Sequence, residues 1–279
     1  MSRFTFPLLM FAVAACAIPD QSGPAAAEPT TIRVVATDYA FEAPDTVQAG
    51  LVTWQLENRG DDGHHLIVYR IDGGHTFDEA LAELAIDGAW PAWMRSVSGP
   101  EGVDDDPAGG GTVTTPLTAG NYLLVCALQH PEGNTHAAHG MARPLVVVGE
   151  ATDVPEPVAT DTIRMVDFAY GIPDTITAGE VRFLLVNTGQ QRHHAIIEQV
   201  PGNATMQSVL ADWELDSIPP GYRQVGGFTS MSPGERAWYQ VTLVPGRYFM
   251  ACLIRDPATG KEHAALGMMR LVEVVKREK

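Results

Sequence analysis

The chain has 279 residues, of which 45% are hydrophobic, and a formal net charge of −16. This length suits one large core or two domains of about 100–150 residues each. Acidic residues outnumber basic ones by 34 to 18, which argues against nucleic acid as a partner. The negative charge has two interpretations, a soluble surface that resists self-association or a face that steers a basic redox partner protein.

The N-terminus predicts a bacterial secretion signal over residues 1–16. Arg3 precedes an apolar run that ends in small residues and Cys16, and this run is too short to span a bilayer as a mature helix. The ending resembles a lipobox, in which Cys16 is the lipid-modified first residue of the mature chain; cleavage at an ordinary small-residue site is the alternative. We therefore expect an exported protein of the bacterial cell envelope, periplasmic or on the outer surface, attached to the membrane through lipidated Cys16. Residues 17–30 then form a flexible tether.

The rest of the chain repeats itself. Residues 31–35 (TIRVV) are echoed by 162–166 (TIRMV), and matching PDT triplets follow in both copies. A repeat of more than a hundred residues indicates a duplicated domain rather than a solenoid. We predict one domain over 31–149 and a second over 161–279. Residues 150–160, rich in proline and acid, read as an exposed linker between them.

Both copies alternate apolar and polar residues in the way that half-buried strands do. Val52, Trp54 and Leu56 face one side in the first copy. Val181 and its alternate neighbours do the same in the second copy. Many short strands punctuated by turns predict an all-β fold of two tandem Greek-key β-sandwiches.

One short helix is expected to interrupt each sandwich. In the first copy Thr76 and Glu79 form a capping box ahead of an apolar run. In the second copy residues 203–215 occupy the equivalent place.

The same four metal-binding residue types recur in the same order in both copies. A histidine pair, His64–His65 or His193–His194, is followed by a cysteine, a histidine and a methionine. The later residues are Cys126, His136 and Met141 in the first copy, and Cys252, His263 and Met268 in the second. A thiolate, two imidazoles and a weak thioether suit copper in both of its oxidation states. The pattern therefore predicts one copper site per domain.

Cysteine usage supports this interpretation. Beyond Cys16 each predicted domain holds a single cysteine, so no disulfide can form within a domain. An interdomain disulfide would require two equivalent sites to meet. A metal thiolate or a buried thiol is the better interpretation.

These segments resemble the cupredoxin family, the plastocyanin and azurin type, over nearly all of both repeats. Asn58 to His64, followed by three apolar residues, is similar to that family's asparagine, spacer, histidine and strand motif, and Asn187 to His193 repeats it. The resemblance implies a cupredoxin-like fold and electron transfer. By its match the copper ligands are His64, Cys126, His136, Met141, His193, Cys252, His263 and Met268. Since strand neighbours point to opposite faces, only one histidine of each pair should enter the site.

The chain departs from small electron carriers in the loop between cysteine and histidine, which spans ten and eleven positions. A comparable loop is similar to that of copper nitrite reductases, which place a histidine beside the cysteine to reach a second copper. Here Val125 and Ala251 occupy that place. The His-x-His pairs of multicopper oxidases are missing too, so we do not expect an enzyme.

Three histidines occur only in the first copy. His130 lies four residues after Cys126 and is a second-choice ligand, whereas its counterpart is Asp256. His139, which Leu266 replaces, could shield the site, carry protons or simply be exposed. His75 is the third.

Two functions of different class follow. The first is an exported, envelope-tethered copper protein that transfers electrons to a redox partner protein. The second is a copper-free, cupredoxin-like binding or scaffold module whose thiols stay without metal. An oxidoreductase acting on a small substrate ranks third, because no second copper cluster motif or acid–base pair accompanies the sites.

Overall fold

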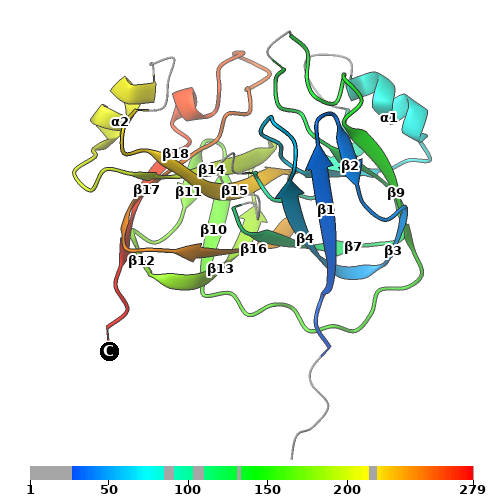
Figure 1. The fold of residues 1–279 in the computed structure, drawn as a ribbon, viewed down its shortest axis with the longest axis horizontal. Helices are drawn as coiled ribbons and strands as arrows, with labels where there is room; N and C mark the ends of the chain where they lie inside the picture. Colours follow the sequence, from blue (N-terminus) through cyan, green and yellow to red (C-terminus); the bar gives the residue numbers. More distant parts are fainter. Residues whose placement is uncertain (1–26, 85–90, 103–109, 131–132, 214–218, 279) are drawn as a thin grey trace, which may run out of the picture.

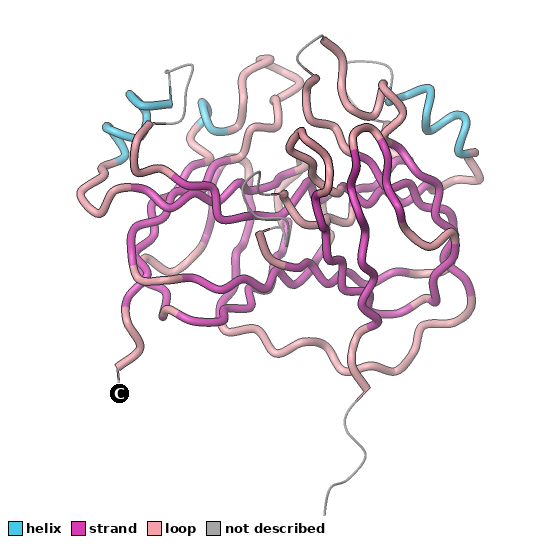
Figure 2. The backbone as a smooth tube through the Cα atoms, in the orientation of Figure 1, coloured by secondary structure: helices cyan, strands magenta, loops and turns pink. Residues whose placement is uncertain are grey.

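The computed structural model describes residues 27–84, 91–102, 110–130, 133–213 and 219–278, and strands dominate it (Figures 1 and 2). The expected signal segment, with Cys16 and most of the tether, lies outside these residues. Within the described ranges, neither helix is long and apolar enough to cross a bilayer. The predicted all-β class is confirmed.

The first half of the chain is a sandwich of two sheets. One sheet has the strand order β2-β1-β4-β7 and the other the order β3-β9-β8-β5-β6. The strands are β1 (Thr30–Thr37), β2 (Ala40–Glu42), β3 (Thr46–Gln48), β4 (Gly50–Asn58), β5 (Ile67–Ile71), β6 (Met94–Ser96), β7 (Thr112–Leu117), β8 (Gly120–Val125) and β9 (Ala142–Val148).

The second half repeats this topology strand for strand. Its sheets have the orders β11-β10-β13-β16 and β12-β18-β17-β14-β15, so each strand has a counterpart at the same place. The strands are β10 (Asp161–Val166), β11 (Ala169–Gly171), β12 (Thr175–Thr177), β13 (Gly179–Asn187), β14 (His193–Val200), β15 (Arg223–Met231), β16 (Arg236–Leu243), β17 (Gly246–Ala251) and β18 (Met269–Val275).

The two sandwiches are joined edge to edge. Strand β16 pairs antiparallel with β7, Trp238 facing Thr114, so that two four-stranded sheets merge into one of eight strands. The isolated bridges Val97 to Met231 and Pro100 to Phe228 add a second line of contact between the β6 and β15 regions. Residues 150–160, the expected linker, run along the opposite side of the molecule from the helices, without strand or helix (Figure 1).

Polar contacts reinforce this joint. Arg95 Nη1 pairs with Glu235 Oε1 at 2.6 Å, and the Tyr239 hydroxyl donates to the Gly110 carbonyl at 2.6 Å. Thr229 Oγ1 donates to the Leu66 carbonyl at 2.9 Å. Because these donors and acceptors are satisfied across the boundary, the two halves are held in a fixed relation.

The predicted alternation accounts for the core. In β4, Val52, Trp54 and Leu56 are buried while Thr53, Gln55 and Glu57 are partly exposed, and Val181 lies in the same way in β13. Each inward row packs with its own facing sheet into a separate apolar cluster, as a sandwich requires. Cys126 and Met141 belong to one of these clusters, and Cys252 and Met268 belong to the other.

The two helices lie beside the sheets at the same end of the molecule (Figure 1). Helix α1 (Phe77–Leu84) begins at the predicted capping box, where the Thr76 amide donates to Glu79 Oε2 at 2.7 Å and the Glu79 amide to Thr76 Oγ1 at 3.2 Å. Helix α2 (Met206–Trp213) starts three residues later than predicted. Its beginning is set by Thr205, whose hydroxyl accepts the Ser208 amide at 3.1 Å.

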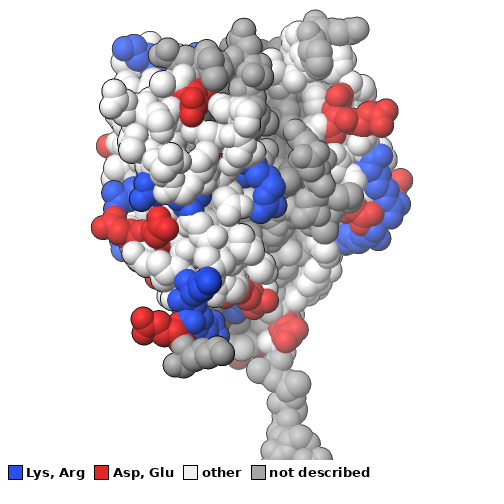
Figure 3. All heavy atoms as spheres, turned by 60° about the vertical axis from the view of Figure 1, so that its left-hand side comes forward, with Lys and Arg blue, Asp and Glu red and all other residues white. Residues whose placement is uncertain are grey.

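Charges are mixed on the face shown in Figure 3, where basic and acidic side chains lie interspersed. Elsewhere in the structure opposite charges are also paired, as Arg247 and Glu273 are at 3.2 Å. Among the residues described on this face, the acidic excess of the chain is not gathered into one patch.

Candidate metal centres

The first cluster brings three of the predicted ligands together. His64 Nδ1 lies 3.2 Å from His136 Nδ1, and Cys126 Sγ lies 3.6 Å from His136 Nδ1 and 4.0 Å from His64 Nδ1. All three residues are buried, with Cys126 fully inaccessible. The cluster therefore presents two imidazole nitrogens and one sulfur to a common point.

The second cluster has the same design. His193 Nδ1 lies 3.1 Å from His263 Nδ1, and Cys252 Sγ lies 3.5 Å from His263 Nδ1. His193, Cys252 and His263 are all fully buried. The three donor atoms lie within 4.8 Å of one another, as those of the first cluster do.

This spacing fits a bound metal ion. Metal–nitrogen and metal–sulfur bonds of about 2.0–2.3 Å place the donors around one ion about 3–4 Å apart, and the separations measured here run from 3.1 to 4.0 Å. Two imidazoles and one thiolate are a donor set that suits copper. The clusters thus have both the geometry and the chemistry to hold a copper ion.

The loops that carry the ligands are closed by backbone hydrogen bonds. Cys126 follows the last residue of β8, and its amide donates to the Met141 carbonyl at 3.1 Å, while the Met141 amide donates to the His136 carbonyl at 2.9 Å. In the second half Cys252, His263 and Met268 make the same two bonds at 3.2 and 2.9 Å. The ten- and eleven-residue loops therefore return to the sheet at the same point.

Both methionines are fully buried and pack in the same apolar cluster as the cysteine of their half, Met141 with Cys126 and Met268 with Cys252. The backbone bonds place each methionine next to the cluster that the sequence assigned to it. Their role as ligands stays a prediction.

The asparagine of the sequence motif braces the segment before the first histidine. Asn58 Nδ2 donates to the Asp62 carbonyl at 2.8 Å, and Asn58 Oδ1 accepts the Gly60 amide at 3.0 Å. Asn187 makes the equivalent bonds to Gln191 and Gly189 at 2.8 and 3.0 Å. The turn held in this way delivers His64 and His193 to the clusters.

The second histidine of each pair, left as an alternative by the sequence, turns away from the cluster. The His65 ring accepts the Ala127 amide on Nε2 at 2.9 Å and contacts Glu101 through Nδ1 at 3.2 Å. His194 Nε2 accepts the Leu253 amide at 2.8 Å. Since an accepting Nε2 carries no proton, both rings hold their proton on Nδ1. Each of these histidines thus anchors the peptide that follows the cluster cysteine.

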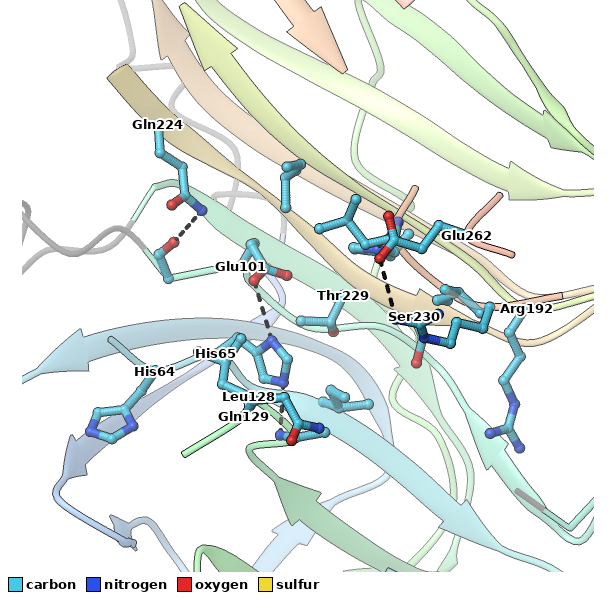
Figure 4. A pocket seen from close by; sticks show the side chains of 18 of the residues that line it. His64, His65, Glu101, Leu128, Gln129, Arg192, Gln224, Thr229, Ser230 and Glu262 are labelled. Atoms are coloured by element: carbon cyan, nitrogen blue, oxygen red, sulfur yellow. Dashed lines mark hydrogen bonds and ion pairs between the residues drawn. The ribbon is translucent and has the colours of Figure 1, made fainter. Parts of the chain in front are cut away.

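His65 and His194 line a pocket of about 800 Å³ between the two halves (Figure 4). Glu101, which also lines it, is buried next to His65. Burial alone would raise the pKa of Glu101, but the neighbouring His65 outweighs it and holds the pKa below its ordinary value. Nothing in the sequence pattern marked Glu101, because its place depends on how the two halves meet.

The outer nitrogens of the cluster histidines have different partners in the two halves. In the second half His193 Nε2 lies 2.6 Å from Asp167 Oδ1, and His263 Nε2 lies 3.1 Å from Gln191 Oε1. In the first half His64 Nε2 is 3.6 Å from Asp38 Oδ1, is buried and has no hydrogen-bond partner within the described part of the chain. Carboxylate and amide partners of this kind orient a ring toward a metal, so the second cluster is the more firmly braced.

Burial sets the protonation of both clusters in the absence of metal. It raises the pKa of Cys126 and of Cys252 to about 12, so both are thiols at neutral pH. Burial and the nearby His193 lower the pKa of His263 to about 4, and burial also lowers the pKa of His136. The imidazoles are therefore neutral and ready to bind, whereas each thiol must release a proton to a metal ion.

His130, the second-choice ligand, lies outside the first cluster. Its ring centroid is 6.0 Å from that of His136 and 4.5 Å from that of His139. His139 is exposed, which is one of the three possibilities that the sequence left open for it. Asp256, the counterpart of His130, accepts a hydrogen bond from Gln191 Nε2 at 2.9 Å and so belongs to the brace of the second cluster.

Comparisons with known proteins were made for the whole chain. No family model and no curated protein matches it. Among solved structures, a dithionite-reduced auracyanin from Roseiflexus castenholzii is 22% identical, with a TM-score of 0.28, over 42% of this chain and 99% of its own. The blue copper oxidase from Nitrosomonas europaea is 17% identical, with a TM-score of 0.25, over 88% of this chain and 86% of its own.

A further solved structure, described as a multicopper oxidase, is 16% identical, with a TM-score of 0.25, over 88% of both chains. These identities and TM-scores are low. The two cupredoxin-like sandwiches are therefore read from the strand topology, and the metal-binding capacity from the geometry of the clusters.

Proposed function

We propose that the protein is an exported copper protein that carries single electrons, with one copper ion in each cluster. The observation that carries the proposal is the twofold occurrence of one donor set, Nδ1, Nδ1 and Sγ, with the same spacing in both halves. Copper bound there would supply a reversible one-electron couple, since thiolate and imidazole ligands suit both of its oxidation states.

The residues of the chain prepare the clusters for this role. Their burial excludes water from the donors, and backbone hydrogen bonds fix the loops that hold them. A rigid donor set changes little between oxidation states, which favours electron transfer. His64, Cys126 and His136 would hold one ion, and His193, Cys252 and His263 the other.

Export and membrane attachment through Cys16 belong to the same proposal, as does a redox partner protein. The support for export and attachment is the sequence of residues 1–16. The division into domains 31–149 and 161–279, with the linker 150–160, is part of the same proposal. An envelope location would place the carrier where lipidation keeps it close to membrane-bound partners.

Copper titration tests the proposal. We expect residues 17–279, prepared reduced and without metal, to bind Cu(II) in both clusters with an intense visible thiolate-to-copper band that ascorbate bleaches and air or ferricyanide restores. Absorption and electron paramagnetic resonance (EPR) spectra recorded together measure it. A folded protein that shows no such band would contradict the proposal and favour the copper-free binding module.

Replacement of the methionines tests their assignment. We expect Met141→Leu and Met268→Leu to keep the copper and the band but to raise the reduction potential of the altered site, because a thioether ligand would stabilise Cu(II) more than Cu(I) and leucine cannot replace it. A Met to Leu exchange conserves volume and costs less than about 1.5 kcal/mol in folding. Spectroelectrochemical titration reads the potential, and the unaltered site of each variant is its internal control. An unchanged potential in both variants would exclude the methionines as ligands.

A further inference from the structure

The surroundings of the two clusters differ in two imidazoles. Next to the first cluster lie His130, whose ring centroid is 6.0 Å from that of His136, and His139, 4.5 Å from His130; the proposed ligand sets use neither residue. At the same positions the second half has Asp256 and Leu266. The duplicated fold thus provides its own comparison, a site with the two histidines and a site without them.

The two rings are arranged like the histidine pairs of the clusters themselves. The centroids of His130 and His139 are 4.5 Å apart, with 47° between the ring planes. The cluster pairs His64–His136 and His193–His263 have centroids 5.1 and 5.0 Å apart, with 67° and 62° between the planes. Two imidazoles at this separation can share one ion.

The Tyr39 ring is close to both of these rings and to the cluster. Its ring centroid is 5.3 Å from His130, 5.5 Å from His139 and 5.5 Å from the cluster residue His136. Phe168 takes the place of Tyr39 in the second half, where it packs on His263 at 4.7 Å. The Tyr39 hydroxyl donates to Asp62 Oδ2 at 3.1 Å, so a carboxylate lies close to Tyr39.

Backbone hydrogen bonds hold the two histidines in place. The His130 amide donates to the Asn134 carbonyl at 2.9 Å, and the His139 amide donates to the His136 carbonyl at 3.1 Å. His139 Nε2 lies 3.3 Å from the Gly133 carbonyl, an acceptor, so this nitrogen carries the ring proton. The lone pair of His139 is therefore on Nδ1, where it can bind a metal.

We propose that His130 and His139 form a surface site for a divalent transition-metal ion, with Cu(II) as the best fit, next to the first cluster. Imidazole is a good ligand for such ions, and Cu(II) binds nitrogen donors most tightly among them. The exposure of His139 lets water complete the coordination. The net charge of −16 raises the local concentration of cations around the protein.

The test compares copper stoichiometry in matched proteins. The variant His130→Asp with His139→Leu gives the first half the residues of the second. His75→Leu removes another imidazole of the first half, one that is partly exposed and stacks on Trp93 at 4.0 Å. Equilibrium dialysis of residues 17–279 against Cu(II) gives the number of ions bound. We expect the double variant to bind one ion fewer than the parent, and His75→Leu to bind the same number as the parent.

EPR identifies the ion that is lost. We expect the EPR difference spectrum between parent and double variant to show nitrogen-coordinated Cu(II). The visible difference spectrum should show no strong band. Equal stoichiometry in the parent and the double variant would overturn the proposal, as would an equal loss in His75→Leu.

The surface site needs neither thiolate, so its test is independent of the proposed function. In a Cys126→Ser, Cys252→Ser background the double variant should still bind one ion fewer. If the protein shows no thiolate-to-copper band, the electron-transfer proposal fails while the difference of one ion remains. If the band is present and the difference is missing, only the surface site is excluded.

Discussion

Cys126→Ser is expected to abolish the thiolate-to-copper band of the first cluster, and Cys252→Ser that of the second, with each variant keeping about half of the parent absorption. The band requires a thiolate donor, and each cluster has a single cysteine. A buried hydroxyl in place of sulfur costs about 1–3 kcal/mol at most, so both variants should fold. Visible absorption after copper loading, with circular dichroism to confirm folding, measures the effect.

Each cysteine variant is the matched control for the other, since the two cysteines occupy equivalent places in the two halves. The double variant should lose the band completely. Retention of the full band in either single variant would show that its cysteine is not a ligand. Loss of the full band in one single variant would instead place the only coloured site in that half.

Acid is expected to destabilise the metal-free protein between about pH 6.5 and pH 4. The pKa of His263 is lowered from 6.5 to about 4, chiefly by burial and then by His193, and the pKa of His194 is lowered to about 4, also chiefly by burial. In this window the unfolded chain binds protons that the folded chain does not, so the free energy of unfolding falls as pH falls. Above pH 6.5 this contribution is fully present.

One pKa unit corresponds to 1.36 kcal/mol, so the buried His263 accounts for up to about 3 kcal/mol of this loss. Urea unfolding of the metal-free protein at pH 7.5 and at pH 4.5 measures it. His263→Gln keeps a polar side chain that does not titrate and should show a smaller decrease. Equal decreases in the parent and in this variant would show that His263 does not contribute.

The local features of both halves could be predicted from the sequence, because each depends on residues close together along the chain. Alternation in β4 and β13 located the inward rows, and the Thr76–Glu79 capping box located α1. The predicted start of α2 was wrong by three residues, since the helix begins after Thr205, whose hydroxyl accepts the Ser208 amide, and the pattern over 203–215 did not single out this cap.

The arrangement between the halves could not be predicted in the same way. Strand alternation indicates that His64 and His65 diverge, but only the packed structure shows His65 against Glu101 and the Ala127 amide. The β7–β16 pairing depends on the register of two edges more than a hundred residues apart in the chain. The pattern of a single strand does not show which distant edge that strand pairs with.

The edge pairing that joins the halves also has a consequence for any shortened chain. Strand β7 is the open edge of the first half and β16 the equivalent edge of the second, so the joint uses the same surface from both sides, as the isologous interface of a symmetric dimer does. One half alone would expose an unpaired edge that is already complementary to its own copy. The two halves are thus related as the subunits of a symmetric dimer are, with a peptide segment joining them and with different residues around their candidate metal centres.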